Sequence, residues 1–124
     1  MMGGDFAPLE AVKGAAEYLT TATADIHLTL IGDEEQVKAH LINHPIPAEK
    51  YTIVHAAQVI EMNEHPTKAL KEKQQSSIAI GFQLLATGKT DAFISAGNTG
   101  AMMVGSLFSI KTIEGVLRPT IGAY

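Results

Sequence analysis

The sequence contains no cysteine among its 124 residues. Disulfide bridges, thiolate zinc sites and a cysteine nucleophile are therefore excluded from this chain. It also has no excess of positive charge, because nine Lys and Arg residues stand against thirteen Asp and Glu residues, for a formal net charge of -4. The chain as a whole consequently lacks the basic character of a nucleic-acid-binding protein.

Long hydrophobic runs and repeats are missing as well. The longest apolar stretch, residues 101–110, is interrupted by Gly105 and Ser106 and is too short to span a bilayer. Neither an internal repeat nor a low-complexity tract is found. With 46% hydrophobic and 18% charged residues, the composition is that of a globular protein with a buried core. The length suits one α/β domain or a piece of a larger one.

Helical and extended patterns alternate along the chain. Apolar spacing and helix-starting residues predict helices over residues 8–21, 33–43, 77–86 and 101–109, and a further helix from residue 67. Strands are predicted over residues 26–31, 51–56, 91–95 and 120–124. Strands separated by helices indicate the α/β class, with a parallel sheet covered on both faces. Ligands of such sheets bind beyond the carboxyl ends of the strands, where we expect a site.

The strongest functional signal is the segment Ser-Ala-Gly-Asn-Thr-Gly-Ala at residues 95–101, between an expected strand and an expected helix. Glycines let backbone amides turn toward a ligand, and a helix start offers unpaired N–H groups. Ser95, Asn98 and Thr99 add side-chain donors, so the segment suits a phosphate or a developing oxyanion. The alternative is an ordinary turn in which Asn98 or Thr99 only caps the helix.

A second glycine-rich turn, formed by Gly3, Gly4 and Asp5, leads into the first expected helix. It could bring backbone amides to the same crevice, with Asp5 capping the helix or orienting a donor. Alternatively, it is only the cap of a βα unit.

Residues 65–77 form the only locally basic stretch, with three lysines against one glutamate. Lys68, Lys71 and Lys73 are candidates to hold phosphate or to meet an acidic partner. The alternative is a solvated helix face of mixed charge.

Other polar residues give weaker signals. Ser76 and Ser77 are candidate caps of the helix that follows them. His65 is a candidate general acid or base, or simply an exposed loop histidine. His40 and His44 could share a helix face, but no third ligand lies nearby in sequence, so no metal site is predicted.

Seven ordered motifs resemble those of the bacterial phosphate acyltransferase family, also called PlsX. They are MGGDFAP (2–8), IGDE (31–34), VHA (54–56), IEM (60–62), HP with KAL (65–70), SS (76–77) and SAGNTGA (95–101). The resemblance runs from Met2 to about Pro119. Two departures matter, because the family opens with a strand before the first motif and its chains continue far beyond Tyr124. We therefore expect residues 1–124 to be the N-terminal part of a single α/β phosphate acyltransferase domain, lacking the first strand and the C-terminal half.

This resemblance implies a three-layer α/β/α sandwich with a mainly parallel sheet, like that of isocitrate and isopropylmalate dehydrogenases. It implies a cytoplasmic homodimer, loosely associated with the inner face of the cell membrane. The implied reaction transfers a fatty acyl group from acyl-[acyl carrier protein] to inorganic phosphate, giving acyl phosphate for phospholipid synthesis, with no cofactor and no metal. Two alternatives remain open, a phosphotransacetylase-like enzyme acting on acyl-CoA and a non-catalytic anion-binding α/β module.

In such an enzyme phosphate is itself the nucleophile, so none is required from the protein. The expected catalytic residues are Asn98 and Ser95. The expected phosphate-binding residues are Gly97, Thr99, Gly100, Gly3, Gly4 and Asp5. The expected contacts to the carrier protein or phosphate are His65, Lys68, Lys71, Lys73, Ser76 and Ser77.

Overall fold

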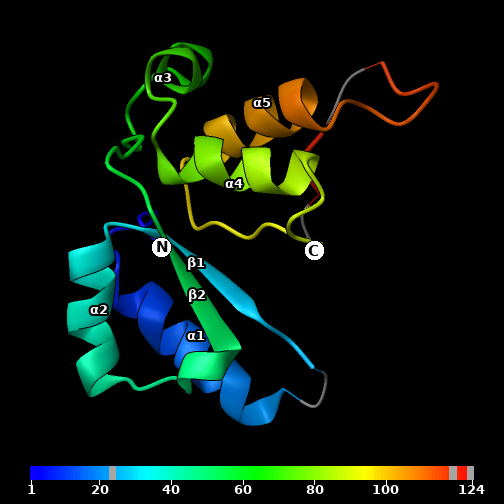
Figure 1. The fold of residues 1–124 in the computed structure, drawn as a ribbon. Coiled ribbons are helices and arrows are strands. Elements are labelled where there is room, and N and C mark those ends of the chain that lie inside the picture. The colour runs from blue at the N-terminus through cyan, green and yellow to red at the C-terminus, as the bar shows by residue number, and fades with distance from the viewer. Residues whose placement is uncertain (23–24, 118–119, 123–124) are drawn as a thin grey trace.

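The computed structural model describes residues 1–22, 25–117 and 120–122. Within these ranges the chain forms two strands and five α-helices (Figure 1). In chain order they are α1 (Leu9–Thr21), β1 (Leu28–Gly32), α2 (Glu34–Asn43), the 3-10 turn η1 (Ala48–Lys50), β2 (Tyr51–His55), α3 (Pro66–Glu72), α4 (Ser77–Ala86) and α5 (Thr99–Ser109). No helix in the described ranges is long and apolar enough to cross a membrane.

The two strands pair in parallel, in a register that runs from Leu28 opposite Tyr51 to Gly32 opposite His55. The chain returns from the end of β1 to the start of β2 through α2, as a parallel pair requires. The predicted α/β class is thus confirmed. The third layer of the expected sandwich stays a prediction.

One hydrophobic core lies between the sheet and the first two helices. Its buried residues are Val12 of α1, Leu30 of β1, Val37 and Leu41 of α2, and Ile46. Leu28 and Leu30 point to this face of β1, because alternate residues of a strand share a face. Tyr51 and Ile53, on β2, also pack against the cluster. Both helices therefore cover the same face of the sheet.

A second core joins α3, α4 and α5, which lie beyond the carboxyl ends of the strands (Figure 1). Its buried residues are Ile60, Ala69, Ile78, Phe82 and Ala101. Glycine allows α4 and α5 to approach closely, since a Cβ on Gly105 would lie 2.3 Å from the Phe82 ring. Phe82 in turn meets Phe93 edge to face, with ring centroids 5.2 Å apart.

Two predicted strands are not observed. Residues 91–95 belong to no strand, although their sequence favours one, and neither do residues 120–122. The predicted strand at 120–124 otherwise lies outside the described residues. A strand needs a hydrogen-bonded neighbour, and the described sheet consists of β1 and β2 alone. Phe93 is held instead through its ring, against Phe82 and Gly81.

Candidate functional site

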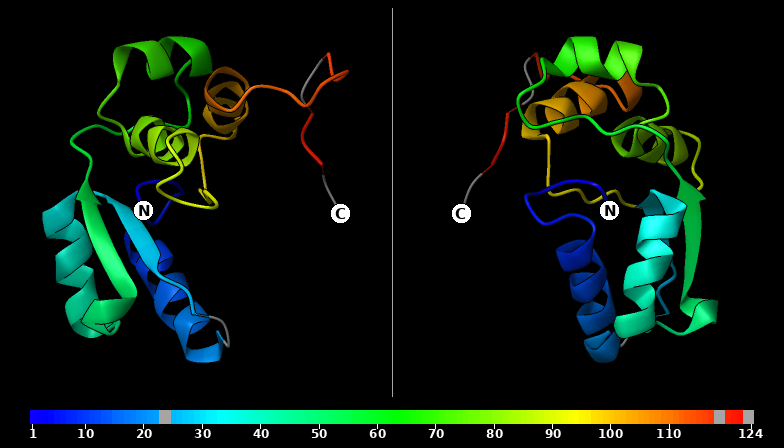
Figure 2. Two further views of the ribbon diagram at one scale, coloured as in Figure 1. Left: turned by 45° about the vertical axis from the view of Figure 1, so that its right-hand side comes forward. Right: turned by 90° about the vertical axis from the view of Figure 1, so that its left-hand side faces the viewer.

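The candidate site lies where the two strands end. β1 ends at Gly32 and β2 ends at the neighbouring His55. Both views in Figure 2 place the N-terminus at this edge, close to the segment that joins α4 to α5. Met2 belongs to the same edge, because its sulfur lies 3.0 Å from the position of a Cβ on Gly32. The edge that the parallel topology predicts for a ligand thus collects both glycine-rich turns.

The two glycine-rich turns touch backbone to backbone. A Cβ on Gly3 would lie 2.7 Å from the carbonyl oxygen of Gly97 and 2.9 Å from its nitrogen. Gly4 has a φ of +91° and Gly97 a φ of +150°, values that residues with a side chain rarely adopt. Side chains at these glycine positions are therefore disfavoured by contact or by backbone conformation, and their absence lets the peptide groups of the two turns meet.

Asn98 is the most constrained side chain of the site, at 5% exposure. Its Oδ1 accepts from the Ala101 N–H at 3.1 Å and so caps α5. Its Nδ2 donates toward the carbonyl oxygens of Glu61 at 3.0 Å, Met62 at 3.3 Å and Glu64 at 3.3 Å. Asn98 is thus the helix cap that was the alternative interpretation of this segment, and its catalytic role stays a prediction. The amide is fully occupied by protein groups, so the residue ties the first turn of α5 to the loop before α3.

The first turn of α5 supplies the open donors of the site. The first intrahelical bond runs from the Met102 N–H to the Asn98 carbonyl, and Asn98 itself takes the Ala101 N–H. The N–H groups of Thr99 and Gly100 have no acceptor inside the helix. They lie at the positive end of the helix dipole, where an anion is stabilised.

Ser95 shapes the turn that precedes this helix. Its hydroxyl donates to the Gly97 carbonyl at 2.9 Å and accepts from the Gly97 N–H at 3.4 Å. These short-range bonds fix the conformation of the turn around Gly97.

Comparison with known proteins identifies the family of the chain. A family model described as fatty acid synthesis protein matches residues 1–124. The phosphate acyltransferase of Dictyoglomus turgidum is 47% identical over 120 residues, which cover 97% of this chain and 35% of that protein. The phosphate acyltransferase of Chlorobaculum tepidum is 47% identical over 123 residues, covering 99% of this chain and 37% of that protein. The chain belongs to the fatty acid synthesis protein family.

The family resemblance expected from the seven motifs is thus confirmed. A third relative, the phosphate acyltransferase of Dehalococcoides mccartyi, is 44% identical over 121 residues, covering 98% of this chain and 34% of that protein. The chain therefore spans about a third of the length of the curated relatives it matches.

In this family member the loop of residues 59–64 contacts Asn98 of the site and is held by an ion pair. Lys73 Nζ donates to Glu64 Oε2 at 2.6 Å and to the Val59 carbonyl at 2.7 Å. Glu64 Oε2 also accepts from the Glu61 N–H at 2.7 Å. The hydrogen bond from Lys73, and next the one from the Glu61 N–H, lowers the pKa of Glu64. This pair could not be predicted from the sequence, because no regular spacing joins residues on either side of a short helix.

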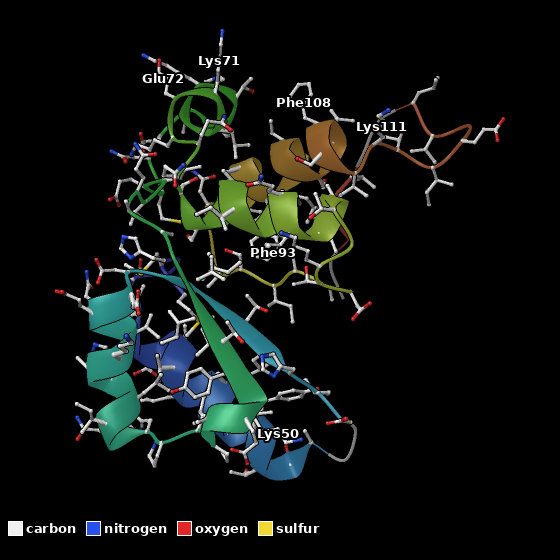
Figure 3. All side chains as sticks on the ribbon, viewed as in Figure 1. Lys50, Lys71, Glu72, Phe93, Phe108 and Lys111 are labelled. Atoms are coloured by element: carbon white, nitrogen blue, oxygen red, sulfur yellow. The ribbon has the colours of Figure 1, made fainter. Side chains whose placement is uncertain are left out.

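The other expected contacts are spread more widely. Lys68 and Lys71 are exposed on α3, and Figure 3 shows Lys71 pointing away from the sheet. His65 is exposed at the start of α3, where its side chain makes no capping bond. Ser76 is fully buried and caps α4, accepting from the Ala79 N–H at 3.3 Å, which confirms its predicted cap.

The structure also places Asp5 and Ser77, two other candidate caps. Asp5 is exposed and does not cap α1, which begins after Pro8 without a side-chain cap. The reason is that three residues still separate Asp5 from the first turn, which is too many for a cap. Ser77 is buried within the first turn of α4. No group of three or more His, Asp or Glu side chains that could hold a metal converges in the described ranges.

Proposed function

We propose that this chain is the N-terminal part of a single-domain acyltransferase that moves a fatty acyl group from acyl-[acyl carrier protein] to inorganic phosphate. The observation that carries the proposal is the backbone contact between Gly3 and Gly97 beside the open N–H groups of α5. The names of the relatives, phosphate acyltransferases in each case, agree with an enzyme that uses phosphate.

The proposed reaction requires no nucleophilic side chain, because phosphate is the nucleophile. A phosphate oxygen attacks the thioester carbonyl carbon, an oxyanion forms on the carbonyl oxygen, and the carbon–sulfur bond then breaks. The thiolate leaves on the carrier, and the acyl group stays on phosphate. The enzyme must hold a dianion in line with the carbonyl and stabilise the oxyanion, which peptide N–H groups can do without a metal.

In this proposal the N–H groups of Thr99 and Gly100 hold phosphate or the oxyanion, with the Gly3 and Gly4 turn forming the opposite wall. Asn98 and Ser95 serve catalysis by holding the turn, because their polar atoms are already engaged by the protein. The exposed Lys68 and Lys71 on α3 offer charges that suit an acidic carrier protein.

The proposal extends to the complete sheet, the oligomeric state and the cellular location of the enzyme. The parallel pair of β1 and β2 would belong to a larger, mainly parallel sheet in a three-layer sandwich of the isocitrate dehydrogenase type. The enzyme would act as a cytoplasmic homodimer at the inner face of the membrane. The length of the relatives, about three times that of this chain, leaves room for these layers and contacts.

The test uses a chimaera in which these 124 residues replace the matching third of the Dictyoglomus turgidum protein. Acyl phosphate formed from acyl-carrier protein and phosphate is trapped with hydroxylamine. Thr99→Pro removes one N–H at the first helical position, where proline is tolerated, and the extended ψ of 126° at Asn98 suits a following proline. Thr99→Ala, which keeps that N–H, is the matched control.

We expect Thr99→Pro to lower kcat/KM for phosphate by about a hundredfold and Thr99→Ala to lower it far less. An equal loss of kcat/KM in both variants would show that the Thr99 hydroxyl, and not its N–H group, is the donor. A folded chimaera that uses acyl-CoA but not acyl-carrier protein would support the phosphotransacetylase-like alternative. If the parent enzyme is active and the folded chimaera has neither activity, the result would support the alternative of a non-catalytic anion-binding module.

A further inference from the structure

We infer that Lys73 and Glu64 are a positioning pair, which sets the first turn of α5 through the loop of residues 59–64 and does not itself hold phosphate. The phosphate readout of its test rests on the proposed function, whereas the amide-exchange readout does not.

The first observation is that the pair holds both ends of the loop. Lys73 lies just past the end of α3, and its ammonium group donates to the Val59 carbonyl and to the Glu64 carboxylate. The same carboxylate oxygen accepts the Glu61 N–H at 2.7 Å. Both side chains are partly exposed, and hydrogen bonds between charged groups are stronger than those between neutral ones. These bonds close the loop together with one backbone hydrogen bond, from the Glu64 N–H to the Glu61 carbonyl at 3.2 Å.

The second observation is that Asn98, at the start of α5, is hydrogen-bonded to this loop. The Nδ2 group of Asn98 points at three of its carbonyl oxygens, those of Glu61, Met62 and Glu64. These carbonyls converge on one amide only while the loop keeps its curvature. The opposite end of the same amide caps α5. A change in the loop must therefore move the cap, and with it the N–H groups proposed to bind phosphate.

A third observation connects the loop with the turn before α5. The sulfur of Met62 lies 2.6 Å from the position of a Cβ on Gly97, whose backbone meets Gly3 on its other side. Gly97 is consequently confined between the loop and the N-terminal turn. The start of α3 adds another contact, since Pro66 Cγ lies 2.5 Å from the position of a Cβ on Gly100. Close-packed groups transmit small displacements because they have no free space to relax into.

The rival interpretation is that Lys73 contacts phosphate directly, as its charge alone suggests. The two interpretations differ in what they require of Glu64. A direct contact would gain from Glu64→Gln, because the lysine would then lose its competing carboxylate. A positioning pair fails in the same way whichever partner is removed, and removing both adds little, as coupled residues do.

The experiment is a double-mutant cycle on the chimaera with the Dictyoglomus turgidum protein, using Lys73→Met, Glu64→Gln and the double variant. Exchange of the Ala101 amide, read by NMR, reports the cap at the start of α5. Shifts of the Thr99 and Gly100 amides during titration with inorganic phosphate give its Kd. The matched control is the exposed pair Lys13 and Glu10, 2.7 Å apart on α1 and changed in the same way.

We expect each single variant to speed Ala101 exchange and to raise the phosphate Kd, both by about tenfold, as the loss of a supporting shell typically does. The double variant should add less than twofold. Lys73→Arg, which keeps the charge and several donors, should restore most of the affinity. The Val12 amide, bonded to Pro8 in α1, should keep its exchange rate in every variant, as should Ala101 in the controls.

The inference is overturned if Glu64→Gln leaves the phosphate Kd unchanged or lowers it while Lys73→Met raises it. It is also overturned if Ala101 and Val12 exchange faster by the same factor, because the pair then supports the whole fold and not this turn. If phosphate shifts neither the Thr99 nor the Gly100 amide of the unaltered chimaera, the proposed phosphate site fails by itself. Coupled effects of the pair on Ala101 exchange then support the inference, and their absence defeats it.

Discussion

At the residue scale, Asn98 shows how one side chain can join segments distant in sequence. Its oxygen and its nitrogen have separate tasks, since Oδ1 caps α5 and Nδ2 donates to the loop before α3. A capping role could be read from the sequence, because asparagine before a helix is a common cap. The donor role could not, because its acceptors are backbone carbonyls that only folding brings within reach.

We predict that Asn98→Asp lowers the free energy of unfolding by more than about 2 kcal/mol, since it keeps the cap oxygen but turns a buried donor into an acceptor facing carbonyl oxygens. Urea unfolding followed by circular dichroism measures the loss. Asn98→Ser, which retains a cap without opposing the carbonyls, serves as control. A smaller loss for Asp than for Ser would show that the cap, not the donor, dominates.

At the scale of helices, one glycine is required by a close helix–helix contact, whereas another has free space around it. A Cβ on Gly105 would lie 2.3 Å from the Phe82 ring, whereas a Cβ on Gly14 in α1 would meet nothing within 4 Å. We predict that Gly14→Ala stabilises the fold by about 0.5–1 kcal/mol through helix propensity. Gly105→Ala should destabilise it by about 1–3 kcal/mol through overpacking. Thermal melts of the two variants compare these effects directly, and stabilisation by both would mean that α4 and α5 separate without cost.

The ion pair between Glu64 and Lys73, which lie on either side of α3, makes the stability of the loop depend on pH. Bonds from Lys73 and from the Glu61 N–H hold the pKa of Glu64 below its ordinary value. A carboxylate with a lowered pKa stabilises the folded state above its unfolded pKa of about 4.3, and that stabilisation disappears as the pH falls through the folded value. We predict that unaltered protein is more stable than Glu64→Gln near neutral pH and that the gap closes in acid. A gap that stays constant with pH, measured by urea unfolding, would contradict this assignment.

At the scale of the whole molecule, two groups of elements meet at the carboxyl edge of the sheet. The helices α1 and α2 pack on the strands, and α3, α4 and α5 pack on one another (Figure 2). The glycine turns and the loop of residues 59–64 lie between the two groups. The candidate site is thus placed at their junction, where a ligand can contact both.

Several apolar side chains are exposed at the end of α5 and in the segment that follows it. Phe108 is 69% exposed at the end of α5, and Ile113 and Leu117 beyond it are 82% and 95% exposed. Exposed apolar surface of this kind promotes association. We predict that Phe108→Ser reduces concentration-dependent self-association of the 124-residue chain with little change in its unfolding, as measured by analytical ultracentrifugation. Unchanged association would place the contact elsewhere.

The sequence alone determined the features that depend on near neighbours. Asp33 and Ser76 accept N–H groups three residues ahead of them, so the starts of α2 and α4 follow from local composition. The spacing of apolar residues likewise predicted β1 and β2, and the motifs predicted the family.

Only the tertiary structure decided which predicted elements form and which residues meet. Residues 91–95 have the composition of a strand but no paired neighbour in the described sheet, and ladder bonds cannot be made by one segment alone. The contact of Gly3 with Gly97 and the convergence of Glu64 and Lys73 on one loop join distant positions. Such contacts depend on how whole elements pack, which no local pattern records.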